Sequence, residues 1–173
     1  MDNISLFFLI FGLSNHSPIL DTVMIFGAEF LIYLAFLLVL VLTFKGGVKE
    51  KKALILIILT IPIVILVIKG IHLFFFEPRP FVSFHFLPLI GEKADASFPS
   101  RHTSIMSVIA FAYTYFKSRW GPLFLLFMVW VGIGRIYVGV HYPLDILGGF
   151  FVGIISLMIA MKIKNLLKVT LLR

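Results

Sequence analysis

Long apolar runs separated by short polar stretches constrain the fold of this chain more than any other feature. Two of them, residues 19–44 and 53–76, are longer than the about 20 apolar residues that a helix needs to cross a bilayer. Charged residues make up 13% of the chain, about half the share found in soluble domains. The sequence therefore predicts an all-α, polytopic membrane helical bundle, and its length suits a single domain over residues 1–173.

The apolar runs predict five spanning helices, over residues 19–44, 53–76, 104–116, 122–137 and 144–161. A polar loop, residues 77–98, separates the second span from the third, and Pro62 predicts a kink in the second. Residues 4–13 are apolar but too few to span. They favour a short interfacial helix with Phe7 and Phe8 in the bilayer, and the alternative is a sixth span.

Basic residues follow alternate spans. Ten of the fifteen lysines and arginines lie after the first, third and fifth apolar runs: Lys45, Lys49, Lys51, Lys52, Lys117, Arg119, Lys162, Lys164, Lys168 and Arg173. Cytoplasmic loops carry such an excess, so the sequence predicts a plasma-membrane protein with these loops inside the cell and the others outside. This topology also accounts for the net charge of +7, and no nucleic-acid partner is expected.

Three polar islands fall on the predicted outer side: residues 77–81 (EPRPF), 98–102 (FPSRH) and 134–145 (GRIYVGVHYPLD). In the third, His141 and Asp145 are one helical turn apart, so the carboxylate can hold one imidazole nitrogen and leave the other as a nucleophile or base. Arg135 adds a planar fork for phosphate oxygens. A capped helix end would explain a lone His-x3-Asp pair, but three islands together favour phosphate chemistry.

The other two islands supply further candidates. Ser100 is a good N-cap for a helix whose N-terminus attracts anions, and His102 lies in the same turn. Arg79 is held extended by a proline on each side, and snorkelling to the interface is the alternative explanation for it. His102 with His141 and Asp145 could bind zinc. The three arginines favour an anion instead, so no metal or cofactor is expected.

In this order, the islands resemble the three-part signature of the type-2 phosphatidic acid phosphatase (PAP2) superfamily, K-x6-RP, PSGH and SR-x5-H-x3-D. The matching residues are Arg79 and Pro80, then Pro99, Ser100 and His102, then Arg135, His141 and Asp145. The stretches FEPRPF, ADASFPS and HYPLDILGG look most like the bacitracin-resistance branch, the undecaprenyl diphosphate phosphatases.

The chain departs from the signature at three points. His72 stands where the first lysine is expected, with Lys69 one turn earlier on the same helix face. Arg101 replaces the small or acidic residue between the serine and the histidine of the second part. Gly134 replaces the serine before Arg135. These departures affect the phosphate cradle and leave the predicted nucleophile and acid in place.

The resemblance implies a metal-independent lipid phosphatase acting on undecaprenyl diphosphate at the extracytoplasmic face of the bilayer. His141 would attack the terminal phosphorus and form a phosphohistidine, Asp145 would orient it, and His102 would serve as acid and then base. The predicted phosphate-binding residues are Arg79, Arg135, Ser100, Lys69, His72 and Arg101. Phosphatidylglycerol phosphate and phosphatidate are the alternative substrates, and an anion transporter or an inactive scaffold are the alternatives of other classes.

Two charges inside predicted spans suggest a further contact. Glu29 and Lys69 should both lie about 12 Å below the outer boundary, on consecutive antiparallel helices. A charge at that depth usually faces a partner. We therefore expect an ion pair or a water-bridged pair between them, and the alternative is that Lys69 snorkels upward while Glu29 is protonated.

Overall fold

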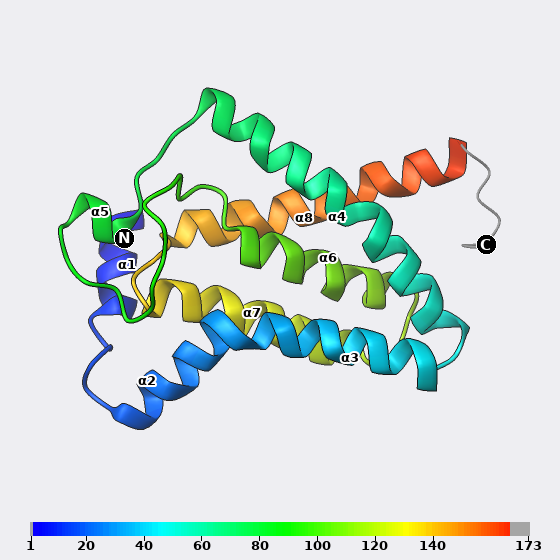
Figure 1. The fold of residues 1–173 in the computed structure, drawn as a ribbon, viewed down its shortest axis with the longest axis horizontal. Helices are drawn as coiled ribbons and strands as arrows, with labels where there is room; N and C mark the ends of the chain where they lie inside the picture. The colour runs from blue at the N-terminus through cyan, green and yellow to red at the C-terminus, as the bar shows by residue number, and fades with distance from the viewer. Residues whose placement is uncertain (1, 167–173) are drawn as a thin grey trace.

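The structure, a computed structural model, describes residues 2–166. Its elements are helices joined by loops, with the π-helical turn η1 inside the first long helix (Figure 1). In chain order they are α1 (Asn3–Phe11), α2 (Pro18–Ile25), η1 (Phe26–Phe30), α3 (Leu31–Lys45), α4 (Val48–Phe74), α5 (Pro80–Ser83), α6 (Arg101–Tyr115), α7 (Gly121–Tyr137) and α8 (Pro143–Leu166).

Three helical segments in the described chain are long and apolar enough to cross a membrane: Pro18–Lys45, which α2, η1 and α3 form together, Val48–Phe74 and Pro143–Lys164. The second runs through Pro62 as one helix. α7 is apolar but has 17 residues, and α6 has 15. At 1.5 Å per residue these two reach about 22–26 Å, somewhat less than the hydrocarbon thickness. The predicted all-α membrane bundle is confirmed in this form.

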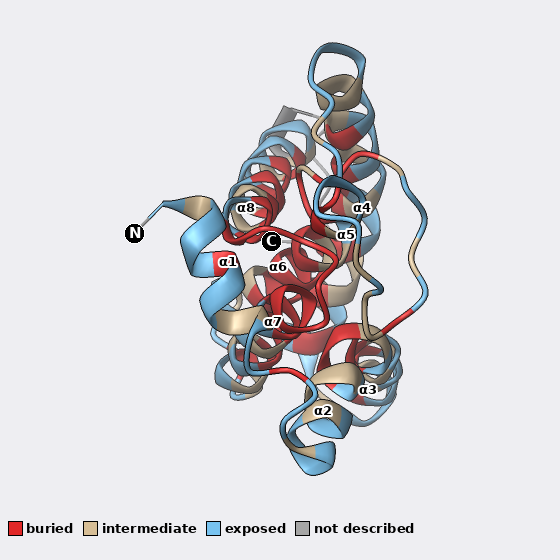
Figure 2. Ribbon diagram, turned by 90° about the vertical axis from the view of Figure 1, so that its left-hand side faces the viewer, coloured by how far each residue is buried: buried red, intermediate tan, exposed pale blue. Residues whose placement is uncertain are grey.

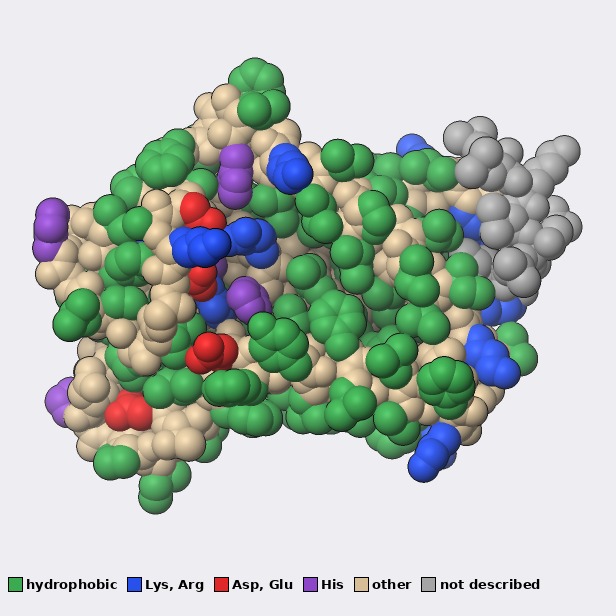
Figure 3. Space-filling view, in the orientation of Figure 1, with side chains coloured by type: hydrophobic (Ala, Val, Ile, Leu, Met, Phe, Trp, Pro, Cys, Tyr) green, Lys and Arg blue, Asp and Glu red, His purple; other side chains and the backbone are tan. Residues whose placement is uncertain are grey.

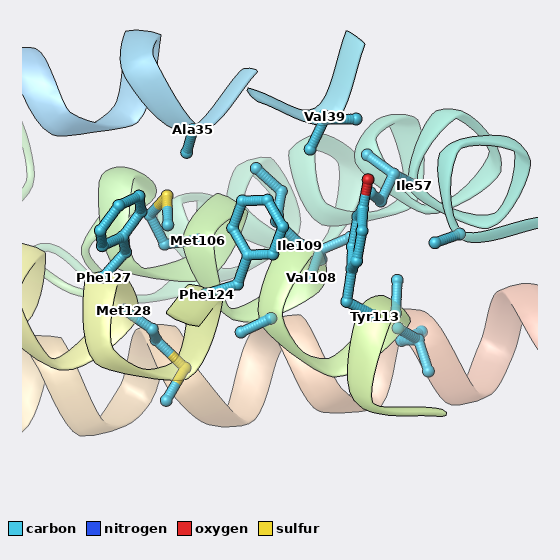
Figure 4. Close-up of a cluster of buried hydrophobic side chains, with 14 of the residues drawn as sticks. Ala35, Val39, Ile57, Met106, Val108, Ile109, Tyr113, Phe124, Phe127 and Met128 are labelled. Atoms are coloured by element: carbon cyan, nitrogen blue, oxygen red, sulfur yellow. The ribbon is translucent and has the colours of Figure 1, made fainter. Parts of the chain in front are cut away.

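The central helix of the bundle is α6, which packs against α4, α7 and α8. Figure 4 shows its buried side chains Met106, Ile109 and Tyr113 beside Phe124 and Phe127 of α7. Figure 2 shows that buried residues lie toward the middle of the bundle and exposed ones on its outside. Because its neighbours surround it, α6 carries small and polar residues that a lipid-facing helix would not need.

Glycines on α8 let it approach α6 closely. A Cβ on Gly153 would lie 2.5 Å from the Ser107 side chain, and one on Gly149 would lie 2.8 Å from the Ser100 carbonyl oxygen. Small residues four apart allow two membrane helices to pack at short range. The start of α8 is thereby tied to the start of α6, where the Ser100 amide donates to the Asp145 carbonyl over 3.0 Å.

The outer surface of the long helices is apolar. Phe44, Leu66 and Phe151 are 84%, 69% and 61% exposed. In Figure 3 apolar side chains cover the length of the visible face, and charged side chains gather at its two ends. So much exposed apolar surface is typical of contact with lipid and not with water.

All three polar islands meet at one end of the bundle, the end of α1 and α5 in Figure 1. The turns between α3 and α4 and between α6 and α7 lie at the opposite end, and they carry the basic residues that the sequence assigned to one side. Lys168 and Arg173, counted with them, lie outside the described residues. The islands and the basic loops are therefore separated by the length of the helices.

α1 lies across the end of the bundle and packs on α7 and α8 (Figure 1). The Asp2 side chain caps it by accepting from the Ser5 amide, and its nine residues are too few to span. The expectation that Phe7 faces the bilayer is wrong, because its ring is fully buried against Phe86 and Tyr142. Phe8 is 42% exposed.

The predicted direct ion pair between Glu29 and Lys69 is not formed. Near the island end, α4 diverges from η1, and α3 and α4 meet toward the opposite end (Figure 1). Within residues 2–166, η1 packs against α2, α3 and α7 but not against α4. Equal depth on consecutive helices does not bring side chains together when the helices splay apart.

Candidate active site

The loop after α4 turns back on itself and carries Arg79 into the bundle. Pro78 and Ala96 form an isolated antiparallel bridge, and the Ser97 amide donates to the Glu77 carbonyl over 2.8 Å. This pairing sets the first island beside the segment that leads into the second. Arg79 is 2% exposed, although a loop supplies it.

His141 lies between α7 and α8, outside both helices. Gly139, with φ of +85°, makes the turn that ends α7, and a Cβ there would also meet the rings of Phe11 and Phe86. Pro143 starts α8 at the position where a missing N–H costs nothing. His141 therefore precedes α8 by two residues and is 1% exposed.

The His141–Asp145 contact crosses the start of α8 instead of running along one helix face. Asp145 Oδ2 lies 3.2 Å from His141 Nδ1 and also accepts from the Tyr142 amide over 2.7 Å. The second bond is the return half of a capping box, with the acid three residues after the cap. Ser97 Oγ donates to the same carboxylate oxygen. Two donors besides the imidazole thus hold this carboxylate in place.

The second ring nitrogen of His141, Nε2, lies against an arginine. Arg79 Nη1 lies 3.1 Å from His141 Nε2 and donates to the Val140 carbonyl over 3.0 Å. A guanidinium only donates, so Nε2 accepts and the ring proton belongs on Nδ1, toward Asp145. Burial, and then the charges of Arg135 and Arg79, hold the pKa of His141 well below its ordinary value. A neutral imidazole with its Nε2 lone pair facing the arginines can act as a nucleophile.

Two carboxylates from the loop between α5 and α6 form ion pairs with Arg79 and Arg135. Glu92 pairs with Arg135 and lies 4.0 Å from Arg79, and Asp95 accepts from Nε and Nη2 of Arg79 over 2.9 and 2.8 Å. Arg135 Nε is buried and has no partner among the described residues. The Glu92 carboxylate thus lies between two guanidiniums, in the kind of site that a phosphate anion would also fill.

Both carboxylates are held in the ionised form. Burial by itself would raise the pKa of Glu92, but the charge and hydrogen bond of Arg135 outweigh it and lower the pKa. Burial by itself would also raise the pKa of Asp95, but the hydrogen bond and charge of Arg79 outweigh it and lower the pKa. The buried charges of Arg79 and Arg135 are thus matched by two carboxylates.

α6 begins beside this cluster. Ser100 is its N-cap residue, as predicted, but its side chain forms no cap bond, and Oγ accepts from the Thr103 hydroxyl over 2.8 Å. The first-turn amides are therefore not occupied by that side chain. His102 lies in this turn, partly buried, and interacts electrostatically with His141 and Arg135. No cluster of three or more metal-ligating side chains occurs within residues 2–166.

A family model for the PAP2 superfamily matches residues 30–168 of this chain. The chain belongs to the PAP2 superfamily. It is 35% identical over 166 residues to the undecaprenyl-diphosphatase BcrC of Bacillus subtilis, a match that covers 96% of this chain and 86% of BcrC.

Two crystal structures share the fold. That of Aquifex aeolicus LpxE superposes with a TM-score of 0.73 at 29% identity, covering 92% of this chain and 94% of LpxE. That of a PAP2-type phosphatidylglycerolphosphate phosphatase from Bacillus subtilis superposes with a TM-score of 0.63 at 26% identity, covering 94% and 86% of the two chains.

Two of the three departures of this PAP2 chain from the signature, His72 and Arg101, line a neighbouring cavity. Lys69 and His72 of α4 and Arg101 of α6 line it, away from the His141 ring. His72 Nε2 lies 3.0 Å from the Phe98 carbonyl oxygen, and Arg101 donates to Asp95 over 2.8 Å. The sequence predicted that all three bind phosphate, and in the structure they lie beside Arg79 and Arg135, with Asp95 joining Arg101 to Arg79.

Three side chains of the site were missed by sequence reasoning: Ser97, Glu92 and Asp95. Ser97 and Asp95 stand in the stretch ADASFPS, which was noticed only as part of the resemblance. The signal that could have found the acids is charge balance, since buried arginines in a membrane protein need anionic partners.

Proposed function

We propose that this PAP2 protein hydrolyses undecaprenyl diphosphate to undecaprenyl phosphate and inorganic phosphate. The observation that carries the proposal is the buried, neutral His141, held by Asp145 on one nitrogen and facing Arg79 with the other. The 35% identity to a B. subtilis undecaprenyl-diphosphatase over nearly the whole chain supports the choice of substrate.

In the first step, His141 Nε2 attacks the terminal phosphorus as the bond from phosphorus to the bridging oxygen breaks. His102 donates a proton to that oxygen, which leaves as the lipid monophosphate, and Asp145 stabilises the positive charge on the phosphohistidine. In the second step, deprotonated His102 takes a proton from a water molecule that attacks the phosphorus. Inorganic phosphate leaves, and His141 is neutral again.

The charge of the transferred phosphoryl group is neutralised by fixed donors. Arg79 and Arg135 supply two guanidiniums, and the buried Nε of Arg135 gains a partner when an anion binds. The first-turn amides of α6, with the positive end of the helix dipole, supply further donors. Stabilisation by arginines and amides requires no metal ion.

We propose that the protein is one domain with five spans, formed by α2–η1–α3, α4, α6, α7 and α8, and with the site on the outer face of the plasma membrane. The separation of the basic turns from the three islands by the length of the helices supports this orientation.

The test is phosphate release by the purified protein from a panel of lipid phosphates and diphosphates in detergent. His141→Ala should lower turnover about a thousandfold or more while the protein stays folded. A rapid quench with terminally labelled diphosphate should trap an acid-labile phosphoenzyme in the wild type and none in the variant. A variant that kept a tenth of the activity would exclude His141 as the nucleophile.

Phosphatidylglycerol phosphate is the second candidate substrate, because the fold is shared with a B. subtilis phosphatidylglycerolphosphate phosphatase at a TM-score of 0.63. Both reactions would use the same histidines and arginines. The ratio of kcat/KM for the two lipids in the same panel decides between them.

A further inference from the structure

A cavity of about 480 Å³ lies between α4 and α6, next to the arginine cluster. Its walls are apolar, formed by Val64, Ile65, Ile68 and Ile105. Its polar side carries four residues: Lys69, His72, Asp95 and Arg101. A cavity with an apolar wall and cations on one side matches a lipid whose head group is anionic.

Asp95 joins this cavity to the His141 site. One of its carboxylate oxygens accepts from Arg79, and the other accepts from Arg101, each over 2.8 Å. Two guanidiniums are thus bridged by a single two-ended anion. A diphosphate is also a two-ended anion, with adjacent phosphoryl groups that share one bridging oxygen. When its terminal group lies at Arg79, its proximal group lies on the Arg101 side.

The charges on the cavity side are not balanced by the described residues. Among those that line the cavity, Asp95 is the only acid, and it is shared with Arg79. Lys69 makes no ion pair with any described residue, and a lysine on a spanning helix ordinarily faces a partner. Arg101 is 53% exposed, so its guanidinium is free to turn from Asp95 toward a ligand.

We propose that Lys69, His72 and Arg101 form a second anion subsite, which binds the proximal phosphoryl group of a lipid diphosphate and sets the preference for diphosphates over monophosphates. The start of the lipid tail lies against the apolar wall. A lipid monophosphate has no proximal phosphoryl group and gains nothing from these three side chains. This inference rests on the proposed lipid diphosphatase function.

The test compares farnesyl diphosphate with farnesyl monophosphate, using the wild type and the Lys69→Gln/Arg101→Gln double variant in detergent. The double variant should lose about tenfold or more in kcat/KM for the diphosphate, and stay within about twofold for the monophosphate. Lys93→Gln, which removes a lysine from the same loop end but not from the cavity, should change neither value. Equal losses on both substrates, or no loss on the diphosphate, would overturn the subsite.

A binding measurement separates failure of the subsite from failure of the proposed function. Methylenediphosphonate is not hydrolysed, and its stabilisation of the folded protein against heat can be compared with that of inorganic phosphate. The wild type should bind the diphosphonate about tenfold more tightly than phosphate, and the double variant should bind the two alike. If the wild type turned over neither farnesyl substrate, the proposed function would fail, while an unchanged preference in the double variant would refute the subsite.

Discussion

The Glu92 carboxylate lies where a phosphoryl group is expected to bind, so Glu92→Gln should change stability and phosphate affinity in opposite directions. Glu92 pairs with Arg135 and lies 4.0 Å from Arg79, and both guanidiniums are 2% exposed. A phosphate that binds at the Nη2 atoms of both arginines competes with this carboxylate. The glutamine keeps the shape of the side chain and removes its charge.

The two effects are of similar size. Removing one partner of a fully buried ion pair costs about 3–5 kcal/mol. Glu92 is 15% exposed and glutamine still offers an acceptor oxygen, so we expect the free energy of unfolding to fall by about 2 kcal/mol. In this variant, the contact between a charged carboxylate and the arginines, worth about 1.5–3 kcal/mol, no longer competes with phosphate. The Kd for inorganic phosphate should fall by about tenfold to a hundredfold.

Thermal unfolding in detergent over a phosphate titration measures both quantities. Glu50→Gln is a matched control at the opposite end, where the carboxylate accepts from the Ser118 hydroxyl over 2.7 Å and the Gly47 amide over 2.9 Å. It should lower stability and leave the phosphate Kd unchanged. An unchanged or higher Kd in Glu92→Gln would refute the reasoning, because Glu92 would then organise Arg135 instead of competing for it.

The effect of Glu92→Gln on the free energy of unfolding should also depend on pH. Because the charge of Arg135 outweighs burial, the pKa of Glu92 lies below its ordinary value of 4.5. A carboxylate with a lowered folded-state pKa stabilises the protein above the unfolded-state pKa and loses that contribution as the pH falls through the folded-state value. The stability difference between wild type and Glu92→Gln should be full at neutral pH and close as the pH falls below 4.5.

Three further predictions concern positioning, packing and topology. Ser97→Ala should lower kcat about tenfold with KM little changed, because the hydroxyl bonds Asp145 and not the substrate; steady-state kinetics showing a change in KM alone would contradict this. Gly153→Leu should lower the free energy of unfolding by about 1–3 kcal/mol in denaturation experiments, since its Cβ would meet α6 at 2.5 Å, and a neutral result would count against close packing. The chain has no native cysteine, so a membrane-impermeant thiol reagent should label a cysteine placed at Lys93 in intact cells and miss one at Lys49; the reverse result would invert the proposed topology.

The helices and the meeting of the islands could be predicted because each rests on a local pattern. Apolar runs fix which segments are helical, and alternation of the spans brings every second loop to the same end. Residues 77–81, 98–102 and 134–145 therefore had to lie at one end, and they do. The contact between His141 and Asp145 was also expected, although it forms across the start of a helix through a capping bond.

What could not be predicted depends on contacts between segments without periodicity. Glu92 and Asp95 stand in a loop whose path is set by the Pro78–Ala96 bridge, which no spacing in the sequence reveals. The divergence of α4 from η1, which separates Glu29 from Lys69, depends on how α6, α7 and α8 fill the space between them. Sequence patterns assign residues to an end of the bundle, and only packing decides which side chains touch.

The position of the proposed nucleophile just before α8 has a consequence for how the protein matures during synthesis. α8 is the last described helix to leave the ribosome, and the His141–Asp145 pair is complete only when its first turn has formed against α6. A chain arrested after α7 would already present both arginines at the membrane surface and still lack an oriented imidazole. Until the final helix packs, the chain therefore carries both arginines without the group proposed to react.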